Sequence, residues 1–335
     1  NLITWYCFTL LSDKLLWRFF SFAAVAFLFI LPVITTKYKN YFLCVIGYCW
    51  MGFVIYFLSF MAGLILINIL FSIMSLKLLT IVSILSATLL TIFSFFNKDN
   101  IEVKNIEIET KKLQPYANKF KLVQLSDIHW GLFIRDKELA KICRLTNELE
   151  PDVILLTGDI IDFHGELNDT LMNHLKQFRA KVLKIMVLGN HELVFNKNEL
   201  VNFFKKADIV LLNNETIQFD ESFNITGVEY GIKDQNLLLK QNNENKYSIL
   251  ISHVPITSSE IIKSFDLQIA GHTHAGQFFP ITILTKLIFK YNYGVYKLNS
   301  GQTTYVSSGT GTWLPPLRFL TRPEVVVYNL NPSEV

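Results

Sequence analysis

The sequence predicts an α/β protein preceded by a transmembrane helical region. Apolar residues make up 51% of the 335 residues, and their excess lies almost wholly before residue 97. After residue 120, short apolar strands alternate with helical patterns, which is typical of βαβ units and a largely parallel sheet. We therefore expect transmembrane helices over 1–97, a junction over 98–120 and an α/β domain over 121–330.

Three apolar runs are candidate membrane spans, each long enough to cross the roughly 30 Å hydrocarbon layer. Leu15 to Ile34 is interrupted only by Arg18, and Leu78 to Phe96 carries no charge. Tyr41 to Leu70 is also uncharged but is longer than one span requires. It is either one tilted helix or a helix with a re-entrant turn near Gly63.

Leu2 to Leu11 is apolar and contains aromatic residues, so we expect it to be the end of a further helix that is cut short at the start. The runs are too long and too many for a cleaved signal peptide. Positive charges at the span ends are nearly balanced, so the positive-inside rule leaves the orientation open.

The junction is expected to contain an edge strand. Asn97 to Asn105 is polar and charged, and Ile101 to Ile108 alternates apolar and polar residues in two phases. This pattern predicts a strand with a bulge near Asn105 that opens the second part of the chain.

Helices and strands then alternate. Apolar spacing predicts helices over 137–149, 171–178 and 199–206, and strands over 121–126, 153–156, 185–188 and 209–212. Four later segments read as strands joined by turns, which suggests a second sheet packed on the first: 216–219, 224–228, 303–307 and 325–330.

Metal-competent side chains follow the predicted strands where each one ends. Carboxyl ends of parallel strands meet at one edge of an open sheet, so these side chains are expected to converge. Singly, each could be a turn or capping residue. Together they form one mixed oxygen and nitrogen set: Asp127, His129, Asp159, Asn190, His253, His272 and His274.

This ligand set suits Mn, Fe or Zn better than Mg or Ca, whose sites are mostly oxygen. Seven ligands are too many for one tetrahedral ion, whereas two ions about 3.5 to 4 Å apart that share a carboxylate would use them all. The net charge of +3 argues against a nucleic-acid binder.

The order of the motifs resembles the calcineurin-like metallophosphoesterase superfamily, over roughly Ile106 to Tyr328. The resemblance implies a four-layer αββα sandwich with its site at the strand ends. It rests on Asp127-x-His129, Gly158-Asp159-x-x-Asp162, Gly189-Asn190-His191-Glu192, His253 and Gly271-His272-x-His274.

The resemblance also implies a role for each residue. Asp127, His129 and His274 would hold the first metal, Asn190, His253 and His272 the second, and Asp159 would bridge them. A metal-bridging hydroxide would then attack the phosphorus. His191 would protonate the leaving oxygen or steady the phosphoryl group, with Asp162 orienting it. We expect two divalent ions, with Mn favoured.

The segment Val306 to Val325 looks like the closing strand of a membrane-associated bacterial branch. That branch includes phosphodiesterases and enzymes that resemble UDP-2,3-diacylglucosamine pyrophosphatases. It more usually has Gly where Ala275 stands, and the added methyl group matters only if the backbone there needs a positive φ. Arg318 could steer a phosphate or pyrophosphate, or it could form a structural ion pair with Glu324.

Phe278 to Tyr293 mixes eight large apolar residues with Lys286 and Lys290. It is either an interfacial amphipathic segment that meets anionic lipid or an insertion helix that covers the core.

We expect a membrane-anchored dimetal phosphohydrolase of a lipid-linked phosphate or nucleotide substrate, such as UDP-2,3-diacylglucosamine. The alternatives are a membrane-tethered phosphatase of small soluble phosphoesters and a non-catalytic metal-binding membrane protein. The expected partner is a lipid bilayer and not nucleic acid. The expected location is the bacterial inner membrane, multi-pass, with the catalytic domain in the cytoplasm. The sequence leaves the oligomeric state undetermined.

Overall fold

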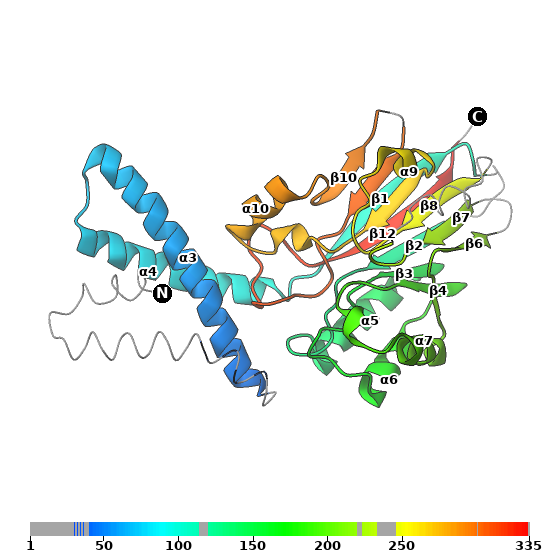
Figure 1. The fold of residues 1–335 in the computed structure, drawn as a ribbon, viewed down its shortest axis with the longest axis horizontal. Helices are drawn as coiled ribbons and strands as arrows, with labels where there is room; N and C mark the ends of the chain where they lie inside the picture. Colours follow the sequence, from blue (N-terminus) through cyan, green and yellow to red (C-terminus); the bar gives the residue numbers. More distant parts are fainter. Residues whose placement is uncertain are drawn as a thin grey trace.

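Two long helices precede a pair of six-stranded sheets in the computed structural model (Figure 1). The structure describes residues 40–113, 120–219, 223–232, 246–299 and 301–333, with positions 30, 32, 34 and 36. The predicted helix end at Leu2 to Leu11 lies outside the described residues, as does the span at Leu15 to Ile34 apart from the isolated positions at its end.

Helices α3 (Tyr41–Phe71) and α4 (Leu76–Asn97) are each long and apolar enough to cross a membrane. α3 begins where the Asn40 side chain accepts a hydrogen bond from the Leu43 N–H, and it runs unbroken through Gly63. The re-entrant alternative is therefore wrong. Its 31 residues give a length of roughly 46 Å, which exceeds the hydrocarbon layer.

The extra length of α3 packs on the rest of the chain. Its buried residues lie in the first two thirds, from Cys44 to Met61, whereas Leu66 and Ile69 near its exposed end are 62% and 72% exposed. The Tyr56 hydroxyl lies 2.8 Å from Ser94 Oγ of α4, and the Ser94 carbonyl accepts a hydrogen bond from the Arg318 N–H. The helix pair is therefore hydrogen-bonded to the loop between β11 (Thr303–Val306) and β12 (Glu324–Pro332).

The first sheet has the strand order β1-β12-β2-β3-β4-β5. Its strands are β1 (Glu102–Thr110), β12 (Glu324–Pro332), β2 (Phe120–Leu125), β3 (Val153–Thr157), β4 (Leu183–Val187) and β5 (Ile209–Leu211). β2, β3, β4 and β5 run parallel to one another, as predicted.

Strands β1 and β12 differ in detail from the prediction. β1 is an edge strand, but its register with β12 is continuous from Glu102 to Thr110, so the bulge expected near Asn105 is absent. β12 was expected in the second sheet. It instead pairs with β1 on one side and antiparallel with β2 on the other, because its apolar side chains fit both faces of the first sheet.

The second sheet has the strand order β10-β11-β9-β8-β7-β6. The inner strands run parallel and the two outer strands are antiparallel to their neighbours. The strands are β6 (Glu215–Phe219), β7 (Phe223–Gly227), β8 (Tyr247–Ile251), β9 (Leu267–Ala270), β10 (Gly294–Lys297) and β11 (Thr303–Val306).

The two sheets pack face to face through one apolar core, in which Leu122 and Val187 of the first sheet join Ile249 and Ile269 of the second. Three helices cover the outer face of the first sheet, and α9 (Ser259–Lys263) lies on the second. The predicted αββα layering is confirmed. The three helices are α5 (Asp136–Glu148), α6 (Asp169–Gln177) and α7 (Lys197–Lys206).

Gly52 is a point of close approach between α3 and the loop after β11. A Cβ added there would lie 2.0 Å from Cδ1 of Leu317, whereas one added at Gly63 meets nothing within 4 Å. Leu317 is fully buried. We expect Gly52→Ala to lower the free energy of unfolding by about 1–3 kcal/mol. Gly63→Ala should leave it unchanged or raise it. Thermal unfolding in detergent measures both, and equal effects would contradict this packing.

Candidate metal centre

The predicted ligands gather where the carboxyl ends of the two sheets' parallel strands meet. Asp127 and His129 follow β2, Asp159 follows β3 and Asn190 follows β4. His253, His272 and His274 come from the turns after β8 and β9 of the other sheet. Every ligand except Asn190 and His272 is buried. The centre therefore bridges the two sheets.

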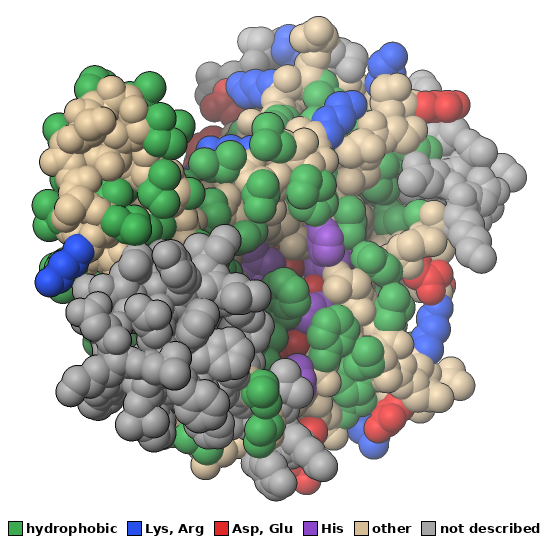
Figure 2. Space-filling model, turned by 60° about the vertical axis from the view of Figure 1, so that its left-hand side comes forward, with side chains coloured by type: hydrophobic (Ala, Val, Ile, Leu, Met, Phe, Trp, Pro, Cys, Tyr) green, Lys and Arg blue, Asp and Glu red, His purple; other side chains and the backbone are tan. Residues whose placement is uncertain are grey.

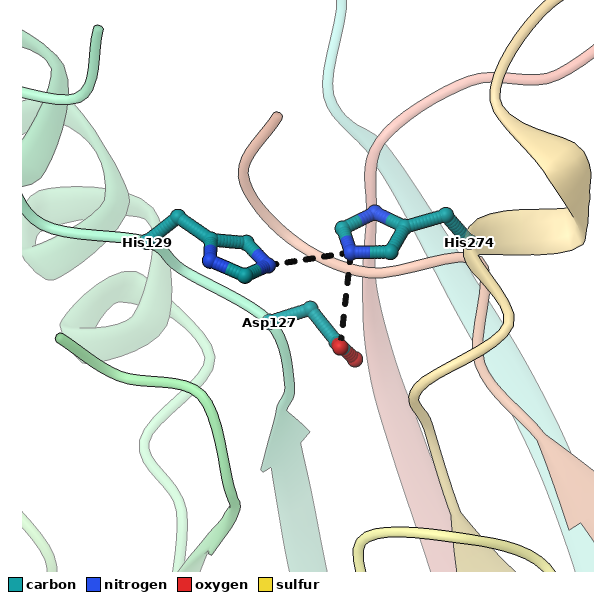
Figure 3. A group of neighbouring side chains, drawn as sticks. All are labelled: Asp127, His129 and His274. Carbon is teal, nitrogen blue, oxygen red and sulfur yellow. Dashed lines mark hydrogen bonds and ion pairs between the residues drawn. The ribbon is translucent and has the colours of Figure 1, made fainter. Parts of the chain in front are cut away.

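One group consists of Asp127, His129 and His274, whose side chains point toward one another (Figure 3). Nε2 of His129 lies 3.0 Å from Nε2 of His274, and the latter atom lies 3.4 Å from Oδ1 of Asp127. Ser126 donates a hydrogen bond to the other oxygen of Asp127, which holds the carboxylate toward the histidines.

A second group consists of Asp159, His253 and His272. Nε2 of His253 lies 3.2 Å from Oδ2 of Asp159, 3.1 Å from Nδ1 of His272 and 3.0 Å from Oδ1 of Asn190. Oδ2 of Asp159 is also 4.0 Å from Nε2 of His129 in the first group. Asp159 therefore lies between the two groups, in the place expected for a bridging carboxylate.

These distances fit divalent cations. Two ligand nitrogens about 2.1 Å from an ion and at a right angle lie roughly 3 Å apart, which matches the separation of the His129 and His274 nitrogens. The mixed imidazole, carboxylate and amide donors suit Mn, Fe or Zn. The described residues thus form a divalent metal site with donors for two ions.

The histidines of the centre differ in charge state. Burial lowers the pKa of His129 to about 4 and that of His272 to about 4, and it lowers the pKa of His274 well below its usual value. These three imidazoles are neutral at pH 7, which is the form of histidine that binds a metal ion.

The two carboxylates at the centre also differ. Burial raises the pKa of Asp127 to about 6. Burial acts in the same direction on Asp159, but the neighbouring His253 outweighs it and brings the pKa of Asp159 below its usual value. Burial opposes the charge on His253, yet Asp159 raises the pKa of His253 to about 9. Asp159 and His253 therefore form a buried ion pair, and a bound cation would take the place of the proton on His253.

His191 and Asp162 form a pair beside these groups. Nδ1 of His191 lies 3.0 Å from Oδ1 of Asp162, and Nε2 of His191 faces the centre, 3.8 Å from Oδ2 of Asp159. The ring of Phe163 stacks on the imidazole with centroids 3.6 Å apart. The sequence predicted the pair, but it gave no signal for Phe163.

The ligands sit on an unusual backbone. Asp127, His129, Asp159, His272 and His274 all have φ between 50° and 72°, a region that costs non-glycine residues about 1 kcal/mol or more each. Glycines beside the ligands allow the turns to approach one another closely. A Cβ on Gly271 would lie 1.9 Å from Oγ of Ser126. Such strain is typical of functional sites.

Glu192 positions two turns of the centre. The sequence suggested a structural role for this residue but not which groups it would contact. Its buried carboxylate accepts hydrogen bonds from four backbone N–H groups: those of Asp159, Ile160, Ile161 and Gly189. Burial raises the pKa of Glu192 to about 7. Glu192 therefore joins the turns after β3 and β4. Of the four hydrogen bonds, only the one from Gly189 joins residues that are close in the sequence.

Arg318 lies behind the centre and is fully buried. It donates hydrogen bonds to the carbonyls of His274 and Gly311, and no ion pair with Glu324 forms among the described residues. In this position Arg318 holds the turn that carries His274. Its contacts do not support the substrate-binding role expected from the sequence, because the guanidinium faces backbone oxygens inside the protein.

The comparisons with known proteins agree with this site. The family model of the calcineurin-like phosphoesterases matches residues 120–276. A metallophosphoesterase of Aquifex aeolicus is 34% identical over 241 residues, covering 69% of this chain and 92% of the relative. A metallophosphoesterase of Campylobacter jejuni is 32% identical over 240 residues, covering 68% of this chain and 63% of the relative.

A bovine transmembrane protein with a metallophosphoesterase domain is 28% identical over 249 residues, covering 67% of this chain and 55% of the relative. The matches thus span less than two thirds of the length of the second and third relatives. The fold, the site and the Aquifex relative define a metal-dependent phosphoesterase. The chain belongs to the calcineurin-like phosphoesterase family.

Ala275 has a φ of 51°, so the methyl group in the place of the more usual glycine lies on a left-handed backbone. We expect Ala275→Gly to raise the free energy of unfolding by about 0.5–1 kcal/mol. The control is Ala140→Gly inside α5, which should lower it by about 1 kcal/mol. Chemical denaturation measures both. Destabilisation by Ala275→Gly would show that the methyl group's packing outweighs the strain.

Glu192→Gln keeps the shape of the side chain but turns an amide NH₂ toward backbone donors. We expect it to lower the free energy of unfolding by about 1–3 kcal/mol and to weaken Mn²⁺ binding, because the turn that carries Asp159 loses its tie. Thermal unfolding and isothermal titration calorimetry measure the two effects. The exposed Glu260→Gln on α9 is the matched control. Unchanged Mn²⁺ affinity in Glu192→Gln would contradict the positioning role.

Proposed function

We propose that this protein is a membrane-anchored dimetal phosphohydrolase that cleaves a phosphodiester or pyrophosphate bond in a lipid-linked substrate such as UDP-2,3-diacylglucosamine. The observation that carries the proposal is the complete ligand set with an adjacent His191–Asp162 pair, next to the apolar helices α3 and α4. Mn²⁺ is the favoured ion among those that suit these donors.

Bound divalent cations would supply a water-derived nucleophile near neutral pH and would stabilise the charge that develops on the phosphoryl group. The chain's own residues orient this chemistry. Asp127, His129 and His274 are the ligands proposed for one ion, and Asn190, His253 and His272 those for the other, with Asp159 shared.

His191 is the proposed general acid. Asp162 accepts a hydrogen bond from Nδ1–H of His191, so Nε2 is the atom that would carry a proton to the leaving oxygen. The stack with Phe163 fixes the plane of the imidazole. A site that binds metal only for structure has no need of this pair, which argues against the non-catalytic alternative.

An apolar margin around the centre supports a substrate with an apolar part. Four large side chains near His191 are 42% to 60% exposed: Phe163, Leu193, Val194 and Trp313. The Trp313 ring lies 5.9 Å from the imidazole. In Figure 2 histidine and acidic side chains lie in a hollow between hydrophobic ones. A small soluble phosphoester would leave this margin uncovered.

Hydrolysis of UDP-2,3-diacylglucosamine by the detergent-solubilised protein with Mn²⁺, beside bis(p-nitrophenyl) phosphate, tests the substrate. We expect turnover of both, lost with EDTA, and a higher kcat/KM for the lipid because the apolar margin binds it. Cleavage of the aryl ester alone would support the dimetal mechanism and refute the lipid nucleotide as the substrate.

A reporter fused after Val335 should be active only in the cytoplasm, where nucleotide lipids are found.

His191→Ala is expected to lower kcat by about 10²–10⁴ and to leave the Mn²⁺ affinity close to that of the parent, since the seven ligands remain. Asp162→Asn should lower kcat less, because the imidazole stays in place with a poorer partner. Steady-state kinetics and titration calorimetry give the two quantities. Full activity in His191→Ala would refute the acid assignment, and loss of Mn²⁺ binding would make His191 a ligand.

A further inference from the structure

Helix α10 (Ile281–Ile288) turns its apolar side outward. It lies at the end of the catalytic domain from which α3 and α4 project (Figure 1). Four aliphatic side chains on it are well exposed: Ile283 at 50%, Leu284 at 48%, Leu287 at 79% and Ile288 at 73%. Its one buried residue is Thr282. The expectation of a core-covering helix is therefore not met.

The exposed side chains form one continuous stripe, because positions i, i+1, i+4 and i+5 share a helix face. A helix on the surface of a soluble protein has the opposite arrangement, with apolar residues inward. An uncovered stripe of this kind marks a surface that meets an apolar partner.

This stripe continues the apolar surface of the two long helices. Phe278, Phe279 and Ile281, just before and at the start of α10, pack in the same apolar cluster as α3 and α4. The Phe278 ring meets the Tyr56 ring edge-on, with centroids 5.6 Å apart. A bilayer that surrounds the exposed end of α3 would thus reach α10.

The charge of the segment selects the kind of surface. Between Phe278 and Tyr293 the only charged side chains are Lys286 and Lys290, and both are exposed. An apolar stripe flanked by lysines, with no acidic residue, fits the interface of a bilayer that contains anionic phospholipid.

We propose that α10 lies in the headgroup region of the bilayer, with its four aliphatic side chains inserted and its lysines at lipid phosphates. The segment leaves the centre at His274 and returns beside it, where Phe289 meets His272 edge-on at 5.8 Å. The metal centre therefore opens at the membrane surface. The inference rests on membrane anchoring by α3 and α4, which is part of the proposed function.

The full chain in vesicles of phosphatidylethanolamine and phosphatidylglycerol tests this inference. Leu287→Cys is labelled with the fluorophore NBD, and lipids with a nitroxide near the headgroup serve as quenchers. We expect a blue-shifted emission and about a twofold loss of intensity. Val182→Cys, 56% exposed at the opposite strand ends, is the matched control and should respond little. The parent chain, labelled in parallel, gives the background from its own cysteines.

Ile69→Cys, near the exposed end of α3, separates membrane anchoring by α3 and α4 from the interfacial position of α10. Quenching at Ile69 without quenching at Leu287 would overturn the interfacial position of α10 and leave the anchoring intact. No quenching at either would overturn both. A blue shift at Leu287 without lipid quenching would mean that protein covers the stripe, which also refutes the lipid contact. Lys286→Glu should weaken the quenching at Leu287 in anionic vesicles only.

Discussion

The structure depends on the convergence of seven donor atoms from two sheets on a space a few ångströms wide. Such a cluster is unfavourable by itself, because it takes imidazoles and carboxylates out of water and holds five of the ligands on strained backbone. The core between the sheets holds the strand ends in place, and Glu192 ties two of the turns together with four hydrogen bonds. The fold thus holds the donor groups in the strained arrangement that a bound cation would use.

Helices α3 and α4 are part of this framework rather than a loosely attached tether. The Ser94 carbonyl of α4 accepts the backbone N–H of Arg318, and the Arg318 guanidinium donates to the carbonyl of His274. Gln277, three residues beyond His274, bonds the carbonyls of Trp313 and Pro315 in the same loop. A movement of α4 relative to the sheets would therefore shift the turn that carries a metal ligand. A loose tether would leave that turn unaffected.

The sequence predicted most of the fold and nearly the whole centre, for physical reasons. Apolar strands that end in metal-competent residues are a local pattern, so the ligands could be read from the order of the motifs. The remaining features depend on contacts between distant segments. Three features have no local signature: the place of β12 between β1 and β2, the burial of Arg318, and the hydrogen bonds that Glu192 accepts from Ile160 and Ile161. For α10 the sequence left two alternatives open, an interfacial segment and a core-covering helix, because a period of 3.6 defines a face but not its direction.

The direction of that face bears on the choice between a soluble and a lipid-linked substrate. Burying an aliphatic side chain is worth about 1.5–3 kcal/mol, so leaving Leu287 and Ile288 in water forgoes much of that free energy. The same applies to Leu193 and Val194 beside the centre. A tethered phosphatase of small esters would also cover α10 with the bilayer, but it would gain nothing from the margin beside the centre. An enzyme that takes its substrate from a bilayer covers both, with the membrane over α10 and the acyl chains over the margin. The two surfaces flank one centre, which favours the lipid-linked substrate.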